Sequence, residues 1–439
     1  MRQRIGVEQL KSPLSDGEIE QALAAVEKAV SELDKLDPAW LSFCRDKSIL
    51  AIENLSFFLR QWLRLHQQGY PSTENDYLRI IERQMGELKQ VYVALYKLAP
   101  GLVYELQQQA PEVFVWLMLS AEFGQEKTHL LSGLSTSQDI SREMACMLVV
   151  QSKLMHLDLY LAGLVDGKTK LAKDTFDYLR LRQTLSVSLS KRWLKEGMIP
   201  ERTVHPVLAT FDVADSIEWM EENLSGEQNL FERLLVKQDR NTWFRQYFGI
   251  QPDALPSEQV NTFAKLLELK EFMQFDLSSP QAPFHLALTG DPEWAYNVLT
   301  ALQDMDEEDG ERWLDSLHVV YGESFPLNPT GLGVDYEWQD ALEILDEWVS
   351  DGHHQLHVPA RLGFALSYDS TLAALQTATI PETYRIWLWR QLCLHARVYI
   401  PWHATMPEIQ QAWIISKLKE IPSASERFNL RSHHATVGY

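Results

Sequence analysis

The sequence predicts an all-α protein, in which an N-terminal antiparallel helical bundle is followed by a short array of helical repeats. Three observations support this fold class: long amphipathic patterns in the first half, a recurring helix-start phrase in the second half, and the lack of alternating strand patterns with hairpin turns. The chain has 439 residues, 45% of them hydrophobic, which is too long for one ordinary core. We therefore expect a bundle at 1–200, helical repeats at 201–422 and a flexible tail at 423–439.

The helices of the bundle are predicted from apolar stripes that lie between clear start and stop signals. Ser15 and Glu18 form a capping box, and the apolar residues that follow recur every three or four positions as far as Leu33. Gly197 and Pro200 end the last helix of this region. The other expected helices cover 49–63, 78–95, 102–109, 111–123, 137–164 and 171–195.

The repeat array is predicted from a short phrase that recurs after Pro200. Leu288–Asp291 opens one apolar helix, and Leu366–Asp369 opens another 78 residues later. Thr210–Asp212 is a possible third copy, 79 residues before Thr289. In each copy a small or hydroxyl residue followed by Asp would cap a helix N-terminus. A spacing of 78 residues is about twice the roughly 40-residue period of HEAT-type repeats, so we expect stacked HEAT-like helix pairs.

The charge of the chain limits its partners. The formal net charge is −21 at pH 7, and a strongly acidic chain is repelled by phosphate backbones and anionic lipids. We therefore predict no nucleic-acid partner and no membrane partner, and we favour a basic or partly folded protein. The alternative interpretation is that the acidity only keeps the protein soluble.

The cysteines favour a cytoplasmic protein. Cys44, Cys146 and Cys393 lie far apart in apolar, helical contexts, and no CxxC pair exists. This usage is typical of reduced, buried thiols. Residues 1–10 lack the apolar run of a signal peptide, and the longest apolar stretches, 113–119 and 144–150, are too short for a membrane span.

Part of the second half resembles a known family. The stretch LALTGDPEWAYNVLTAL at 286–302 and the ending YGESFPL at 321–327 carry the resemblance, and later segments follow in the same order at 338–348, 361–378 and 400–414. They resemble an uncharacterised bacterial HEAT-like repeat family found in type VI secretion gene clusters. The resemblance covers roughly 284–418. It implies an accessory or adaptor role for a secretion effector or spike component, and it attaches no catalytic residues.

One segment matches a loose phosphate-loop pattern. Ala162–Thr169 reads AGLVDGKT, which places a Lys and a hydroxyl where nucleotide chemistry needs them. That chemistry also needs a strand directly before the loop, and 148–164 is apolar at helical spacing. We therefore interpret the segment as a helix–turn–helix connection with Gly167 as a left-handed cap.

Two further clusters contain metal-binding residue types. The acidic run, defined here as Asp304, Asp306, Glu307, Glu308 and Asp309, departs from a calcium loop because its sixth position is not Gly. An acidic loop leading into a helix at 311–321, or a docking patch for a basic partner, explains it better. His353, His354 and His357 lie between Gly352 and Pro359, which favours a surface loop over a zinc site. No GxSxG or HExxH motif is present, and we predict no catalytic residue, cofactor or metal site.

The tryptophans are the remaining candidates for a binding surface. Trp387 and Trp389 are two positions apart, so on a helix they cannot both face one core. An exposed Trp is often a binding hot spot, so we select Trp387, Trp389 and Trp402, together with the acidic run, as partner-binding residues.

The predicted function is therefore non-enzymatic protein binding. Two alternatives stay open. The chain could be an immunity or inhibitor protein that blocks a basic toxin. It could also be an enzyme or toxin with a site in the N-terminal half, for which no resemblance was found.

Overall fold

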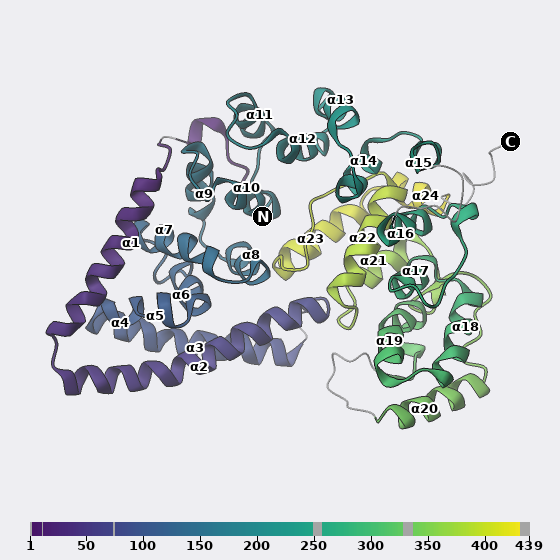
Figure 1. The fold of residues 1–439 in the computed structure, drawn as a ribbon, viewed down its shortest axis with the longest axis horizontal. Coiled ribbons are helices and arrows are strands. Elements are labelled where there is room, and N and C mark those ends of the chain that lie inside the picture. The colour runs from purple at the N-terminus through teal and green to yellow at the C-terminus, as the bar shows by residue number, and fades with distance from the viewer. Residues whose placement is uncertain (1, 11, 73–74, 249–256, 328–336, 431–439) are drawn as a thin grey trace. The chain divides into compact units, whose positions relative to one another are not determined.

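The structure is a computed structural model that describes residues 2–10, 12–72, 75–248, 257–327 and 337–430 (Figure 1). Within these residues the regular secondary structure is almost entirely helical, and the only strands are β1 (Ala360–Arg361) and β2 (Phe364–Ala365). The all-α prediction is confirmed. The chain divides into two compact units. Unit 1 contains residues 1–66, 71–213 and 401–411, and unit 2 contains residues 67–70, 214–400 and 412–439. The main division thus falls at 213/214, whereas the sequence placed it at 200/201.

Unit 1 is built from helices of very different lengths. The helix α1 packs against α4 and α7, and α9 packs against α10. The bounds are α1 (Asp16–Ser31), α2 (Pro38–Gln68, in unit 1 as far as His66), α3 (Asp76–Leu98), α4 (Pro100–Tyr104), α5 (Leu106–Gln109), α6 (Pro111–Met118), α7 (Lys127–Thr136), α8 (Arg142–Gln151), α9 (Leu157–Asp166), α10 (Ala172–Leu181), α11 (Val187–Lys195) and α12 (Glu201–Ala209), with 3-10 helices η1 (Val7–Gln9), η2 (Glu32–Lys35) and η3 (Ser137–Asp139).

Two long helices expected in unit 1 are each broken into shorter ones. The region 137–164 contains η3, α8 and most of α9, and 171–195 contains α10 and α11. Ser141 and Ser186 start α8 and α11, because their hydroxyls accept hydrogen bonds from the amides of Met144 and Leu189. Gln183, between α10 and α11, has a positive φ of 58°. Serine side chains compete for backbone amides in this way, and an apolar stripe alone does not reveal the break.

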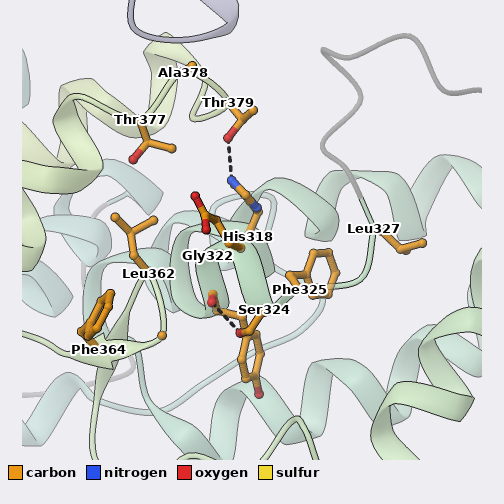
Figure 2. A pocket seen from close by; sticks show the side chains of 13 residues that line it. His318, Gly322, Ser324, Phe325, Leu327, Leu362, Phe364, Thr377, Ala378 and Thr379 are labelled. Carbon is orange, nitrogen blue, oxygen red and sulfur yellow. Dashed lines mark hydrogen bonds between the residues drawn. The ribbon is translucent and has the colours of Figure 1, made fainter.

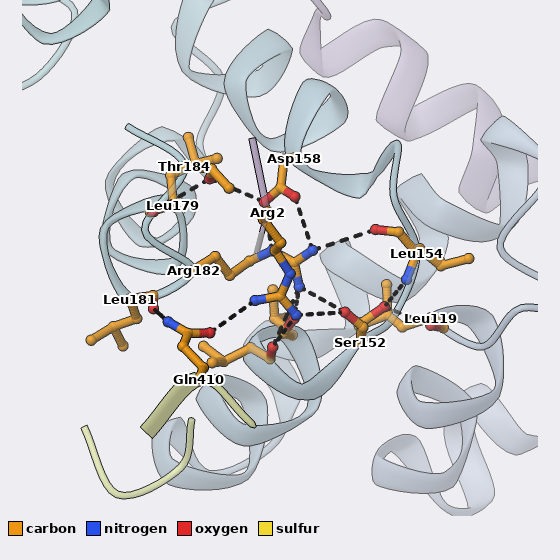
Figure 3. Close-up of polar contacts among 12 residues, drawn as sticks. Arg2, Leu119, Ser152, Leu154, Asp158, Leu179, Leu181, Arg182, Thr184 and Gln410 are labelled. Atoms are coloured by element: carbon orange, nitrogen blue, oxygen red, sulfur yellow. Dashed lines mark hydrogen bonds and ion pairs between the residues drawn. The ribbon is translucent and has the colours of Figure 1, made fainter. Parts of the chain in front are cut away.

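A buried arginine fixes the interior of unit 1 (Figure 3). The Arg182 side chain is fully buried and donates from Nε and Nη2 to the two carboxylate oxygens of Asp158, at 2.6 and 3.1 Å. Its Nη1 donates to the carbonyls of Val149 and Ser152, at the end of α8. Arg2 donates to the Ser152 carbonyl as well. Burial, and next the charge of Arg182, lower the pKa of Arg2 to about 10. The N-terminal segment is therefore held to the same helix end.

A segment from near the C-terminus completes unit 1. Gln410 donates to the carbonyl of Leu181 at 2.7 Å, and Gln151 donates to the carbonyl of Thr405 at 2.8 Å. Gln183 donates to the carbonyl of Pro401 at 3.0 Å. Because residues 401–411 belong to unit 1, the two units are not consecutive stretches of sequence, and a chain cut at residue 200 would lack part of the first unit.

Unit 2 contains shorter helices and the single hairpin of the described residues. Its packing pairs include α16 with α17, α17 with α19, and α21 with α22. The bounds are α13 (Ala214–Asn223), α14 (Leu230–Val236), α15 (Arg240–Phe248), α16 (Glu258–Leu266), α17 (Ala282–Thr289), α18 (Pro292–Ala301), α19 (Glu307–Tyr321), α20 (Trp338–Ser350), α21 (Tyr368–Leu375), α22 (Glu382–Ala396) and α24 (Pro422–Asn429), with η4 (Glu227–Asn229), η6 (Lys270–Phe272), η7 (Leu302–Asp304) and η8 (Gly322–Ser324); α23 (Glu408–Lys419) begins in the segment 401–411.

The tail differs from the expected flexible segment over its first residues. Residues 422–429 form α24, and Phe428 is fully buried against the ring of Tyr368. Burial of this apolar ring stabilises the docked helix, although the segment is polar in composition, so α24 packs onto unit 2. The rest of the expected tail, 431–439, lies outside the described residues.

The recurring phrase starts helices in two of its three copies, but with different residues. Asp291 caps α18 by accepting from the amides of Glu293 and Trp294. In the second copy Ser367, rather than Asp369, caps α21. In the third copy Asp212 has a positive φ of 56° and donates its amide back to the end of α12. The copies are therefore similar in sequence without being equivalent in structure.

We predict opposite effects of alanine at two glycines of unit 1. A Cβ at Gly167 would lie 1.5 Å from the carbonyl oxygen of Leu14, so Gly167→Ala should lower the free energy of unfolding by roughly 1–3 kcal/mol. A Cβ at Gly86, inside α3, meets nothing within 4 Å, so Gly86→Ala should raise it by about 0.5–1 kcal/mol. Urea unfolding measures both, and equal effects of the two changes would contradict the packing at Gly167.

Candidate functional site

A cleft lies in unit 2 (Figure 2). Its volume is about 720 Å³. It lies between the end of α19 with η8, the β1–β2 hairpin, and the turn after α21. Leu362 and Phe364 of the hairpin lie on one side of His318, and Phe325 and Leu327 lie on the other. The remaining lining residues are Tyr321, Gly322, Glu323, Ser324, Gly363, Thr377, Ala378 and Thr379.

The tip of the hairpin has an unusual backbone. Leu362 and Gly363 both have positive φ, 55° and 77°, as the two central residues of a type I′ hairpin turn require. A leucine rarely adopts this conformation, and such strain is found most often at functional sites. The amides of Leu362 and Gly363 each donate at 2.8 Å, to the carbonyls of Val319 and Val320. The amides of the hairpin therefore donate to carbonyls in the last turn of α19, which have no hydrogen-bond partner within the helix.

A glycine at the end of α19 permits this close approach. Gly322 has a φ of 62°, and a Cβ there would lie 2.8 Å from the Cα of Leu362. A side chain at this position would thus push the hairpin away from α19. Strands of two residues are too short to show an alternating pattern, so the hairpin was missed in the sequence. The Leu362–Gly363 pair is the one local signal that could have found it.

The base of the hairpin is held by a buried arginine. Arg361 is fully buried, and its guanidinium donates to the Thr371 hydroxyl, to the Gln391 side chain, and to the carbonyls of Ala287 and Leu288. These carbonyls lie in the last turn of α17, where a helix presents partial negative charge and unpaired acceptors. Arg361 therefore joins the hairpin to α17, α21 and α22 at one point.

His318 supplies the buried polar group of the cleft. Its Nε2 lies 2.6 Å from the hydroxyl of Thr379, and its buried Nδ1 has no hydrogen-bond partner within the described part of the chain. Burial lowers the pKa of His318 to about 4, so the ring is neutral at pH 7. The cleft thus offers apolar walls and a neutral imidazole, and Glu323 supplies a carboxylate at its surface.

The acidic run lies at the other end of α19. Asp306 caps the helix by accepting from the amide of Asp309, and Glu307, Glu308 and Asp309 form its first turn. We expected an acidic loop before a helix at 311–321. Most of this segment is instead helical, because the cap at Asp306 makes α19 start four residues earlier. All five carboxylates are exposed, and Asp304 ends η7. One face of α19 is shared by Glu307, Glu311 and His318, because their spacing matches the helical repeat. From Glu307 to His318, which lines the cleft, the distance along the helix is roughly 16 Å.

Two of the three selected tryptophans are buried. Trp389 and Trp402 are only 4% and 8% exposed, and the Trp402 indole donates to the side chain of Gln411. Trp387 is half-buried, with its ring 5.1 Å from that of Phe263 and with Arg390 over its face. Trp402 belongs to unit 1 and the other two to unit 2. Trp389 and Trp402 are therefore interior residues rather than exposed hot spots, and only Trp387 is partly accessible.

The segment that matches the phosphate-loop pattern follows a helix and not a strand, as its apolar spacing indicates. The helix α9 precedes the loop, and the Thr169 hydroxyl donates to the carbonyl of Leu164. Lys168, rather than Gly167, has the left-handed conformation, with a φ of 51°. The expected cap at Gly167 was therefore wrong by one residue. Gly167 is needed instead for the close approach of Leu14.

No family model, no curated protein and no solved structure matched this chain. In the part of the chain that the structure describes, no cluster of three or more His, Cys, Asp or Glu side chains is arranged for a metal ion. No described helix combines the length and apolarity that crossing a membrane requires. The cleft and the acidic run of α19 are therefore the features on which a function can be argued.

We predict that replacing Arg361 loosens the hairpin. Arg361→Met removes the guanidinium donors to Ala287, Leu288 and Thr371 at once, and should lower the free energy of unfolding of the full chain by on the order of 2–4 kcal/mol. Arg79→Met, at an exposed arginine, is the control and should change it little. Urea unfolding gives both values. A loss no larger than that of the control would show that Arg361 does not hold the hairpin.

The lowered pKa of His318 predicts a pH effect on stability. Between about pH 6.5 and pH 4 the unfolded chain binds more protons at this residue than the folded chain, so stability falls as the pH falls through this range. Asp315, whose pKa burial raises to about 6, has the opposite effect. His318→Gln should therefore lose less stability than the unchanged protein from pH 7 to pH 5, by on the order of 1–2 kcal/mol.

Chemical unfolding at the two pH values measures this difference, and His353→Gln controls for removal of one exposed imidazole. If His318→Gln and the unchanged protein have the same pH dependence, the ring of His318 is not buried in its neutral form.

Proposed function

We propose that this chain is a non-enzymatic protein-binding module, and that the cleft of unit 2 receives an apolar side chain of the client. The observation that carries the proposal is the exposure of Phe364. This ring is 72% exposed at the edge of the cleft, on a hairpin whose backbone is held by α19 and whose base is held by Arg361. A large exposed aromatic side chain on a fixed support is the usual form of a binding hot spot.

The strain at Leu362 supports the same proposal. A residue such as Asn or Gly would adopt its positive φ at lower cost, so leucine is not the choice that stability alone favours. Its side chain lines the cleft, where it adds apolar surface beside Phe364 (Figure 2). The leucine thus lowers local stability and supplies an apolar wall of the cleft. Such a loss of stability is expected where a partner is bound.

The charge indicates which clients fit. The net charge is −21, and the exposed acidic run lies at the N-terminal end of α19, where Glu307 shares a helix face with His318 of the cleft. Such a surface attracts a basic or partly folded protein and raises its rate of association. By the resemblance of residues 284–418, we propose an effector or spike component of a type VI secretion system as the client. The same charge argument fits a second role, in which this chain is an inhibitor that binds a basic toxin. The identity of the client distinguishes an adaptor from an inhibitor.

The test is affinity purification of the tagged full chain from its own cells at low and high salt. We expect a stoichiometric protein partner that high salt releases, because the exposed carboxylates are screened. Phe364→Ala should lose most of this partner while keeping its unfolding free energy, since the ring is largely exposed. Leu362→Asn should also lose it without loss of stability.

The matched control is Val358→Ala, an exposed apolar side chain outside the cleft lining, which should keep the partner. Absence of a partner at both salt concentrations would contradict the binding function. Equal retention by Phe364→Ala and Val358→Ala would instead contradict the role of the cleft.

A further inference from the structure

The outer face of α2 has an exposed apolar stripe. Phe43, Leu50 and Phe57 are 59%, 61% and 43% exposed, and they recur every seven residues. Seven residues are close to two helical turns, so the three side chains lie along one line about 21 Å long. Soluble helices usually place such a line toward a core or a partner. The opposite face of α2 already has its core contacts, through Leu41, Leu55, Leu59 and Trp62.

Charges are segregated along the same face. Asp46 and Glu53 lie beside the stripe in the N-terminal part of α2, and Arg60 and Arg64 lie beside it in the C-terminal part. All four residues are exposed, and so is Lys47 on the other side of the stripe, whose Nζ lies 5.5 Å from the centre of the Phe43 ring. When two copies of this helix run in opposite directions, Asp46 of one copy comes near the arginines of the other copy.

We propose that α2 pairs in antiparallel orientation with α2 of a second copy of this chain. In the register that places Leu50 opposite Phe57 of the second copy, Asp46 comes beside Arg60 of that copy. Phe43 then comes beside the aliphatic part of the Arg64 side chain. The two-fold axis repeats each of these contacts. Glu53 meets Glu53 of the second copy at this axis. Parallel pairing would instead set all four charged residues, Asp46, Glu53, Arg60 and Arg64, each against its own copy.

The size of the stripe sets the strength of this association. Three large side chains on each copy cover much less than the roughly 1,600 Å² of a standard stable complex. We therefore expect a dimer with a dissociation constant on the order of 10–100 µM, visible only at raised concentration. Because α2 belongs to unit 1 and the client cleft to unit 2, this proposal does not depend on the proposed function.

Sedimentation of the full chain over a concentration series tests the association. The unchanged protein should shift from monomer to dimer, and Leu50→Glu should weaken the dimer at least tenfold. Leu98→Glu is the matched control, because Leu98 is 62% exposed on α3 of the same unit, and it should leave the dimer unchanged. A monomer at every concentration would overturn the proposal, and so would an equal effect of the two changes.

The direction of pairing has its own test. Asp46→Arg and Arg60→Asp should each weaken the dimer, and the double variant should restore it, since the charges are exchanged together. Under oxidation, a mixture of Leu50→Cys and Phe57→Cys chains should form a mixed disulfide dimer, whereas Leu50→Cys alone should not, because its two copies lie about 10 Å apart. The unchanged chain controls for its own cysteines. Disulfide dimers of Leu50→Cys alone would show parallel pairing and overturn the proposal.

Discussion

The contact between the buried guanidinium of Arg361 and the end of α17 is the constraint on which the cleft depends. The hairpin has only four strand residues and one exposed aromatic ring, so it cannot hold a position by its own burial. Arg361 fixes its base, and the amides of Leu362 and Gly363 fix its tip on α19. The cleft is therefore the space between elements that are tied at both ends, which favours a client site that exists before binding.

Unit 1 also contains a buried arginine at a helix end, but there a carboxylate neutralises the charge. Arg182 also places its guanidinium at a helix end, on carbonyls at and after the end of α8, and Asp158 neutralises it. Around Arg361 the acceptors described above are two carbonyls, a hydroxyl and an amide oxygen, which are neutral dipoles. A buried arginine can keep its charge in such a place because the helix end supplies partial negative charge and its high intrinsic pKa resists deprotonation.

Features set by neighbouring residues could be predicted from the sequence, and features set by distant contacts could not. The Ser15 capping box and the cap at Asp291 follow from side chains within three residues of the amides they bind, and the all-α class follows from apolar spacing. The burial of Trp389 and Trp402, and the docking of residues 401–411 into unit 1, depend on residues far away along the chain. The cleft was missed for the same reason, since its walls come from 318–327, 362–364 and 377–379.

The cleft is preformed only if the hairpin backbone is fixed to α19. Amide hydrogen exchange of Leu362 and Gly363 tests this directly, since both amides donate to carbonyls at the end of that helix. We predict that these two amides exchange as slowly as the amides within α19, although they lie in a turn near the surface. Exchange as fast as that of an exposed loop would show that the hairpin opens freely, and would contradict a preformed site.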